Sequence, residues 1–320
     1  MDIQRQFAGV HWVWGGGISF VYEVQPLIVV KVPKPGGEER EKFRRELEIY
    51  EILSQHPRCP SLVECFLYAA DGIFLEYMRD ISLAYGKQFN MTRDNNTRVV
   101  TKVKYLEPLP LQKLWMNDLA QGVAFLGSLN LAHGDLRPEN ILLDRNQLKI
   151  SDFDCTAENC WFPKHLINYG FEVYDNQCLA DDPYEHGPKV VDLLMDMKFP
   201  KLEADPLIDD IIDKCWHNRY RTLADLAIHT EALLKGPISD AQNHAAPSTL
   251  GAQQRSNTQV ASNDSYNMDQ YHSAETLSKK RELCQDLEKR GLLRLLTSGK
   301  PMELAFTMEH RHVLPTAPAN

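Results

Sequence analysis

The N-terminal quarter of the chain alternates between two patterns of apolar positions. Short apolar and β-branched runs, typical of strands, occupy residues 20–24, 27–32, 62–68 and 73–77. Between the second and third runs the period changes to that of a helix, over residues 38–55. Four apolar side chains recur there every three or four positions and predict one buried face: Phe43, Leu47, Tyr50 and Leu53. This part of the chain is expected to form a small unit of strands plus one helix.

The pattern then becomes mainly helical. Residues 84–104 are polar and irregular, which predicts an exposed insertion. A long helix is expected over residues 111–130, and helical periodicity returns over residues 189–235, with breaks at Pro200 and Pro206. Between these helical parts two short strands are expected, at residues 141–143 and 148–150.

The last third of the chain changes composition. Residues 236–275 are rich in Ser, Asn, Gln, Ala and Asp and poor in large apolar groups, which predicts a disordered linker. Residues 276–320 are expected to form a C-terminal helix and tail, with the helical pattern over residues 276–297. That helix is either docked or frayed. We expect deletion of everything after Gly236 to leave the melting temperature nearly unchanged.

Composition excludes several classes of protein. Of 320 residues, 43% are hydrophobic and 25% charged, which is typical of a soluble globular chain. The 35 basic and 44 acidic residues give a net charge of −9, which argues against nucleic acid as the main partner. Seven cysteines without a CxxC pair argue against a disulfide framework or a zinc ribbon.

Membrane and secretion signals are also missing from the pattern. No stretch approaches the ~18 consecutive apolar residues that a membrane span needs. The N-terminus lacks the basic and apolar segments of a signal peptide. We therefore expect an intracellular protein, cytoplasmic or nuclear, with no membrane partner.

The sharpest chemical signal is the run His133-Gly134-Asp135-Leu136-Arg137-Pro138-Glu139-Asn140, followed by Asp152-Phe153-Asp154. These groups suit phosphoryl transfer, in which Asp135 accepts the proton of an attacking hydroxyl. Arg137 can neutralise charge on the transferred group. Asn140 and Asp152 offer the oxygen ligands that Mg²⁺ prefers, and a hairpin between them would bring both to one metal ion.

These two segments resemble the catalytic loop HRDLKPEN and the DFG motif of eukaryotic protein kinases. The resemblance implies an α+β, bilobal protein-kinase-like fold. Residues 14–78 would form a β-rich N-lobe with one helix, and residues 79–235 a mainly helical, reduced C-lobe. It also implies ATP and Mg²⁺ as cofactors, and transfer to a Ser or Thr hydroxyl of a protein substrate.

Upstream residues match the same family in order. Val29-Val30-Lys31 is similar to the VAIK strand, so Lys31 would contact the α- and β-phosphates. Glu46 and Glu48 compete to be its ion-pair partner. At 100° per residue, Glu46 lies about 60° from Phe43 and borders the apolar face, while Glu48 lies about 140° away. This orientation toward the apolar face favours Glu46 as the ion-pair partner of Lys31.

Two further nucleotide contacts follow from the resemblance. The run Phe74-Leu75-Glu76-Tyr77-Met78 resembles the connection between kinase lobes, where backbone groups at Glu76 and Met78 would bind the adenine edge. Gly15, Gly16 and Gly17 stand where a glycine-rich loop would cover the phosphates. An ordinary flexible turn explains these three glycines equally well.

The chain departs from the family at several positions. Gly134 replaces the HRD arginine, Asp154 replaces the DFG glycine, and Arg137 replaces a lysine. Leu166 lies only fourteen positions after Asp152, yet its surroundings already look like the end of the central C-lobe helix, and no APE motif appears. The chain is either a truncated relative or the product of a gene model that skipped a segment.

Two alternatives to a protein kinase therefore stay open. A non-catalytic pseudokinase or scaffold module would explain the missing activation segment. A small-molecule phosphotransferase of the aminoglycoside or choline kinase type would explain Gly134, because its motif resembles HGDLHPGN. The intact set Lys31, Asp135, Asn140 and Asp152 argues against the pseudokinase, and Glu139 with the helix around Glu46 favours the protein-kinase branch.

Overall fold

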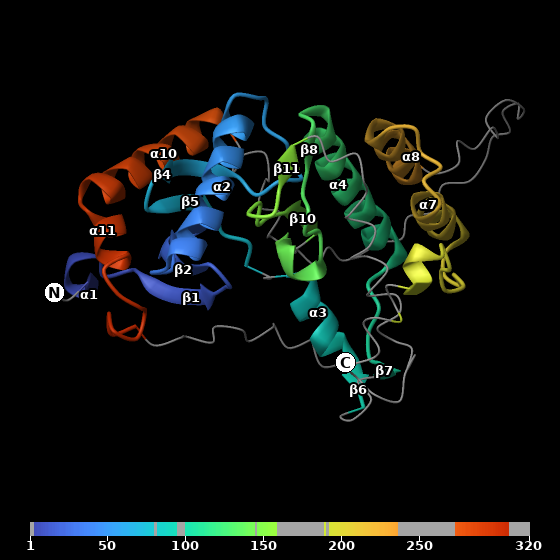
Figure 1. The fold of residues 1–320 in the computed structure, drawn as a ribbon, viewed down its shortest axis with the longest axis horizontal. Helices are drawn as coiled ribbons and strands as arrows, with labels where there is room; N and C mark the ends of the chain where they lie inside the picture. Colours follow the sequence, from blue (N-terminus) through green and yellow to red (C-terminus); the bar gives the residue numbers. More distant parts are fainter. Residues whose placement is uncertain are drawn as a thin grey trace, which may run out of the picture.

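The computed structural model describes residues 3–79, 82–94, 100–144, 146–158, 189, 192–235 and 273–306. They form two lobes, and the expected α+β, bilobal architecture is confirmed (Figure 1). None of the helices in these ranges combines the length and apolarity that crossing a membrane requires.

The N-lobe is built on a five-stranded antiparallel sheet of order β1-β2-β3-β5-β4. Its strands are β1 (His11–Gly15), β2 (Ser19–Gln25), β3 (Ile28–Pro33), β4 (Cys65–Ala69) and β5 (Gly72–Glu76). All six residues of β3 are buried, as expected of a central strand covered on both faces. Helix α2 (Gly37–Ser54) covers the face that turns toward the C-lobe, through Phe43, Ile49 and Tyr50.

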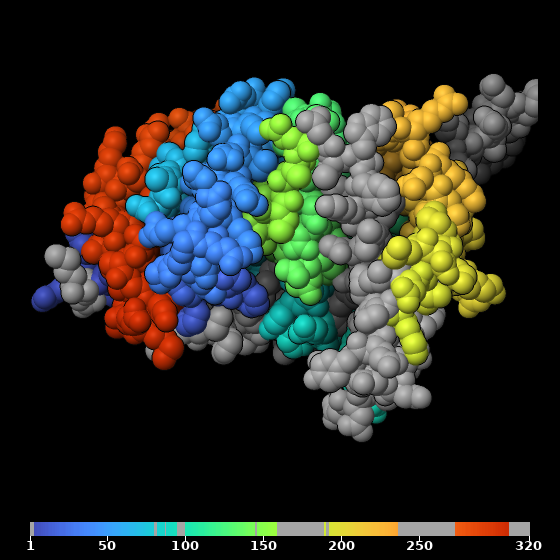
Figure 2. Space-filling view, viewed as in Figure 1, coloured from blue at the N-terminus to red at the C-terminus, as the bar shows by residue number. Residues whose placement is uncertain are grey.

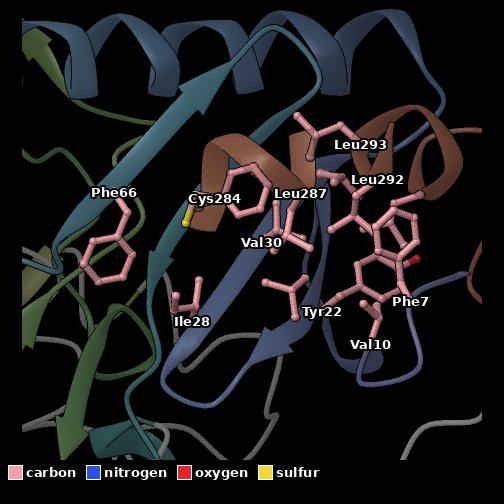
Figure 3. Packing of buried hydrophobic residues seen from close by; sticks show 14 of the residues in the cluster. Phe7, Val10, Tyr22, Ile28, Val30, Phe66, Cys284, Leu287, Leu292 and Leu293 are labelled. Carbon is pink, nitrogen blue, oxygen red and sulfur yellow. The ribbon is translucent and has the colours of Figure 1, made fainter. Parts of the chain in front are cut away.

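The opposite face of the sheet, here called the outer face, is covered by both ends of the described chain. Helices α1 (Ile3–Gln6), α10 (Ala274–Lys289) and α11 (Leu292–Leu296) lie against it (Figure 1). Leu287, Leu292 and Leu293 point from the two C-terminal helices into side chains of the strands (Figure 3). In the space-filling view the C-terminal segment directly adjoins the N-lobe (Figure 2). The C-terminal helix is therefore docked, which contradicts the expectation that the tail adds little to stability.

The C-lobe begins with α3 (Leu83–Asn90) and the hairpin β6 (Met91–Arg93) and β7 (Val100–Val103). Residues 84–104 were expected to be irregular, and that expectation is wrong for this helix and hairpin. Ser82 caps α3 by accepting from the backbone N–H of Tyr85, a local signal that the polar composition obscured.

The described part of the C-lobe also contains three longer helices and two small sheets. Helix α4 (Leu109–Ser128) packs against α8 (Leu223–Lys235), and α7 (Pro206–Trp216) packs against α8. Pro206 is the first residue of α7, capped by Asp205, so it begins a helix as the expected break implied. The small sheets contain β8 (Leu131–Ala132), β9 (Ile141–Asp144), β10 (Gln147–Ile150) and β11 (Ala157–Glu158), and the 3₁₀ turn η1 (Pro138–Asn140) precedes β9.

Most of the predicted linker lies outside the described residues. Its last three residues, 273–275, are ordered, because Ser273 caps α10 and the helix begins at Ala274. Sequence reasoning also missed β1 and α1. Both lobes share one core, with Phe43 and Ile73 from the N-lobe and Leu136 and Phe153 from the C-lobe.

Candidate active site

Lys31 is the centre of a buried charge cluster. Its Nζ lies 2.6 Å from Glu46 Oε2 and 2.5 Å from Asp152 Oδ1. Strand β3 supplies the lysine and α2 supplies Glu46, which lies beside Phe43 and Tyr50 on the buried face of the helix. Glu46 is completely inaccessible, whereas Glu48 is exposed. The structure thus brings Lys31 together with the glutamate that helical facing favoured.

Burial and charge act in opposite directions on this cluster. Burial alone would lower the pKa of Lys31, but the carboxylates of Glu46 and Asp152 raise it above its usual value. Burial raises the pKa of Glu46 to about 7, against the opposing effect of Lys31. Asp152 also loses solvation, yet Lys31 keeps its pKa below the usual range. Lys31 therefore stays charged, and Glu46 is the group of this cluster that titrates near neutral pH.

A buried histidine, His133, holds the loop of residues 133–140, here called the catalytic loop after the motif that it resembles. The Asp135 backbone N–H donates to His133 Nδ1 at 3.3 Å, so the proton of the neutral ring lies on Nε2. That Nε2 donates to the Ser151 carbonyl at 2.9 Å. Burial lowers the pKa of His133, which keeps the ring neutral and this pair of contacts intact.

Asn140 and Arg137 brace Asp135. The Asn140 side-chain amide donates to the Asp135 carbonyl at 2.8 Å and to Asp135 Oδ2 at 3.0 Å. Arg137 Nε lies 3.2 Å from the same Oδ2 and 3.9 Å from Glu139 Oε2. Pro138 opens the 3₁₀ turn that aims Asn140 back at Asp135.

The hairpin of β9 and β10 brings Asn140 next to Asp152. Ile141 pairs with Ile150, and the Ser151 N–H donates to the Asn140 carbonyl at 2.9 Å, which places Asp152 one residue beyond. No group of three or more His, Cys, Asp or Glu side chains among the described residues could hold a metal ion by itself. One amide oxygen and one carboxylate fit an Mg²⁺ ion whose other ligands come from phosphates.

Three aromatic rings connect α2 to the catalytic loop. Phe153 is fully buried and packs edge-on against Tyr50 of α2, with ring centroids 5.4 Å apart. Its other neighbour is His133, also at 5.4 Å. Asp152 itself has a φ of 68°, a left-handed conformation that costs a non-glycine residue about 1 kcal/mol or more. The Lys31 contact and the buried Phe153 hold it there.

The structure gives a reason for glycine at position 134 that sequence reasoning missed. Its φ is +79°, and a Cβ at this position would collide with the carbonyl oxygen of Cys155. Behind this contact, Thr156 Oγ1 donates to the His133 carbonyl at 3.3 Å, and β11 pairs with β8. The residue that replaces an arginine therefore lets the segment after Asp154 lie directly on the catalytic loop.

The connection between the lobes holds a second ion pair, which sequence reasoning also missed. Lys149 of β10 is 1% exposed, and its Nζ lies 2.6 Å from Glu76 Oε2. The only sequence signal was a lysine within an apolar strand. The Glu76 backbone N–H donates to the Glu64 carbonyl at 2.9 Å. Met78, two residues after Glu76, is also buried.

The three glycines lie at the turn between β1 and β2. Gly15 ends β1, and the Gly16 N–H donates to the Ser19 carbonyl at 3.0 Å. A Cβ on Gly17 would meet nothing within 4 Å. Strand β2 continues from this turn to Val21, which pairs with Lys31.

Sequence comparison finds a known family and several known proteins that part of this chain resembles. Residues 23–160 match the family described as "Protein kinase domain". The chain is 29% identical over 154 residues to human MAP kinase-activated protein kinase 2, covering 43% of this chain and 36% of that protein. It is 31% identical over 188 residues to the human phosphorylase b kinase gamma catalytic chain, liver/testis isoform, covering 55% and 42%. It is 29% identical over 168 residues to the tyrosine-protein kinase receptor torso of Bombyx mori, covering 41% and 21%. The chain spans less than half the length of these relatives.

Proposed function

We propose that this chain belongs to the protein kinase-like family and is an ATP-dependent protein kinase acting on Ser or Thr hydroxyls, because residues 23–160 match the protein kinase domain. The observation that carries the proposal is the placement of Lys31, Glu46 and Asp152 in one ion-pair cluster. The hairpin also brings Asn140 near Asp152, and the Asn140 side-chain amide donates to the Asp135 carboxylate. These groups come from both lobes, as a site closed around a nucleotide requires.

Each of these residues has a role in the proposed reaction. Lys31, held by Glu46, binds the α- and β-phosphates, and the turn at Gly15, Gly16 and Gly17 covers them. The connection between the lobes receives adenine through backbone groups at Glu76 and Met78. Asn140 and Asp152 would hold Mg²⁺, which when bound neutralises charge on the phosphates.

The transfer step needs a base and a counter-charge. Asp135 accepts the proton as the substrate oxygen forms a bond to the γ-phosphorus and the bond to the β-phosphate oxygen breaks, releasing ADP. Asn140 and Arg137 fix the Asp135 carboxylate, and the Arg137 guanidinium offsets negative charge on the transferred group.

A second candidate, a small-molecule phosphotransferase, is favoured by one observation. Gly134 fits the HGD pattern of that group of enzymes, and its close contact with Cys155 excludes any larger residue. This candidate uses the same nucleotide site and differs only in the acceptor.

Labelled ATP separates the candidates. The chain is incubated with labelled Mg-ATP and either a mixture of protein substrates or a panel of aminoglycosides and choline. The proposal expects label in protein, lost in Asp135→Asn, with Mg-ATP binding retained. Label in the small molecules instead would support the second candidate. Mg-ATP binding without transfer to either class would identify a non-catalytic module.

A further inference from the structure

The outer face of the N-lobe sheet is an apolar surface that other parts of the chain cover. Tyr22, Val24, Ile28, Val30 and Val32 form most of it, and all five side chains are at most 1% exposed. Figure 3 shows Tyr22, Ile28 and Val30 beneath the C-terminal helices. Without those helices this apolar area would face water, which a stable monomer avoids.

The occupant of this surface is the chain's own C-terminal segment, residues 273–306. Its helices contribute Leu277, Cys284, Leu287, Leu292, Leu293 and Leu296 to the outer core, all buried. Leu293 approaches Gly72 so closely that a Cβ on this glycine would collide with it. Phe306 packs on Tyr22 with ring centroids 5.1 Å apart. The segment therefore contacts the outer face from α10 to Phe306.

The docked segment reaches the connection between the lobes through charged groups. Arg281 Nη2 of α10 lies 3.7 Å from Glu64 Oε1, and Arg58 Nε lies 2.6 Å from Glu64 Oε2. The Glu64 backbone N–H donates to Glu76 Oε2 at 3.3 Å, and the Glu64 carbonyl accepts from the Glu76 N–H at 2.9 Å. Glu76 Oε2 also forms an ion pair with the buried Lys149 of the C-lobe. A continuous polar path therefore runs from α10 to both sides of the connection.

We propose that residues 273–306 are an intramolecular ligand of the N-lobe, and that their docking holds Glu64 and Glu76 and so stiffens the connection between the lobes. A tighter connection raises the affinity for nucleotide, a consequence that rests on the proposed function. Thirty-seven residues separate Lys235 from Ser273, a length that can span about 120 Å. The chain is therefore long enough for the segment to leave the surface and return.

The test uses the full chain with a specific protease site placed within residues 236–272. After cleavage, gel filtration shows whether the C-terminal fragment stays bound. Hydrogen exchange then reports on the amides of Glu76 and Tyr77, which donate to Glu64 and Leu27. Amides in the middle of α4 serve as the internal reference. Leu293→Asp places a charge in the buried contact, and Arg294→Asp places the same charge on the exposed face of α11.

We expect the cut wild-type chain and the cut Arg294→Asp variant to keep the fragment. The cut Leu293→Asp variant should release it, and exchange at Glu76 and Tyr77 should become roughly tenfold faster while α4 is unchanged. Loss of the fragment from the cut wild-type chain would overturn the proposal. So would a released fragment that leaves exchange at Glu76 and Tyr77 unaltered.

A milder pair of variants covers the case in which Leu293→Asp does not fold. Arg281→Glu, on the exposed side of α10, should speed exchange at Glu76 about threefold, the size expected of one exposed ion pair. Lys289→Glu on the same helix should leave it unchanged, and equal rates in both variants would overturn the charged path. Mg-ATP should bind about threefold more weakly to Arg281→Glu. If neither the wild type nor any variant binds Mg-ATP, the proposed function is wrong. Hydrogen exchange at Glu76 and Tyr77 would still test whether docking stiffens the connection between the lobes.

Discussion

Lys31 is the residue on which nucleotide binding should depend most, because it contacts both Glu46 and Asp152. Mg-ATP at a hundredfold excess over its dissociation constant should stabilise the wild-type chain by about 2.7 kcal/mol. We expect Lys31→Met and Asp152→Asn each to remove most of this gain in a thermal unfolding experiment. Lys42→Met, an exposed lysine of α2 paired with Glu38, should keep it. If all three variants gain as the wild type does, the nucleotide binds elsewhere.

Glu46 should make nucleotide affinity depend on pH. Its pKa is raised to about 7 by burial, so lowering the pH through this value adds a proton and removes the charge that holds Lys31. We expect the affinity for Mg-ATP to fall on acidification from about pH 8 to 6, and to be weaker but flatter in Glu46→Gln. Burial lowers the pKa of His133, which favours its neutral ring.

The nucleotide's own phosphates titrate near pH 6, so the informative quantity is the difference between the two proteins. Calorimetry at several pH values measures it. Parallel pH profiles for the wild type and Glu46→Gln would show that Glu46 keeps its charge throughout.

The secondary-structure elements that could be predicted are those whose apolar residues recur with a clear period along the sequence. The helix expected over residues 38–55 is α2, and the runs at 20–24 and 73–77 are β2 and β5, each within one or two residues. Facing on α2 also distinguished Glu46 from Glu48. These features depend on local spacing, which a sequence displays directly.

The features that were missed or left open depend on partners far away in sequence. A helix was expected where α10 lies, but whether it docks stayed open, because it is rich in charge and its few buried side chains pack on the outer face of the sheet. A signal for a cover on this face was present in β3, where apolar residues point to both faces of the sheet and only Lys31 interrupts them. The Lys149–Glu76 pair and the Gly134–Cys155 contact likewise arise from tertiary packing, which no local pattern encodes.

The docking of α11 leads to a stability prediction that reverses the one made from the sequence. Leu296 is completely buried in the outer core, so Leu296→Ala should lower the free energy of unfolding by about 2–5 kcal/mol. Arg294→Ala on the exposed side of the same helix should change it by less than about 0.5 kcal/mol. Urea denaturation followed by tryptophan fluorescence measures both. Equal stability of the two variants would mean that the tail is dispensable for folding.

Across the whole molecule, the two lobes share one inner core, so the nucleotide clamp and the catalytic loop are held as a unit. Phe153 contacts Tyr50 of α2 and His133 of the catalytic loop, and Lys31 reaches Asp152 across the same boundary. Binding of Mg-ATP needs only these parts. Transfer needs a further surface that aligns the acceptor hydroxyl, and only fourteen positions separate Asp152 from Leu166.

Because binding and transfer need different parts of the molecule, we expect the chain to bind Mg-ATP readily but to transfer phosphate slowly. Alignment supplies about 7–11 kcal/mol in well-oriented reactions, so losing part of it should lower kcat far more than it raises the KM for ATP. A variant with an activation segment of typical length inserted between Thr156 and Leu166 should have a higher kcat at nearly the same KM for ATP. Steady-state kinetics on a protein substrate give both constants. Rapid phosphorylation by the unaltered chain, abolished by Asp135→Asn, would instead show that β11 and the contact of Cys155 with Gly134 align the acceptor segment sufficiently by themselves.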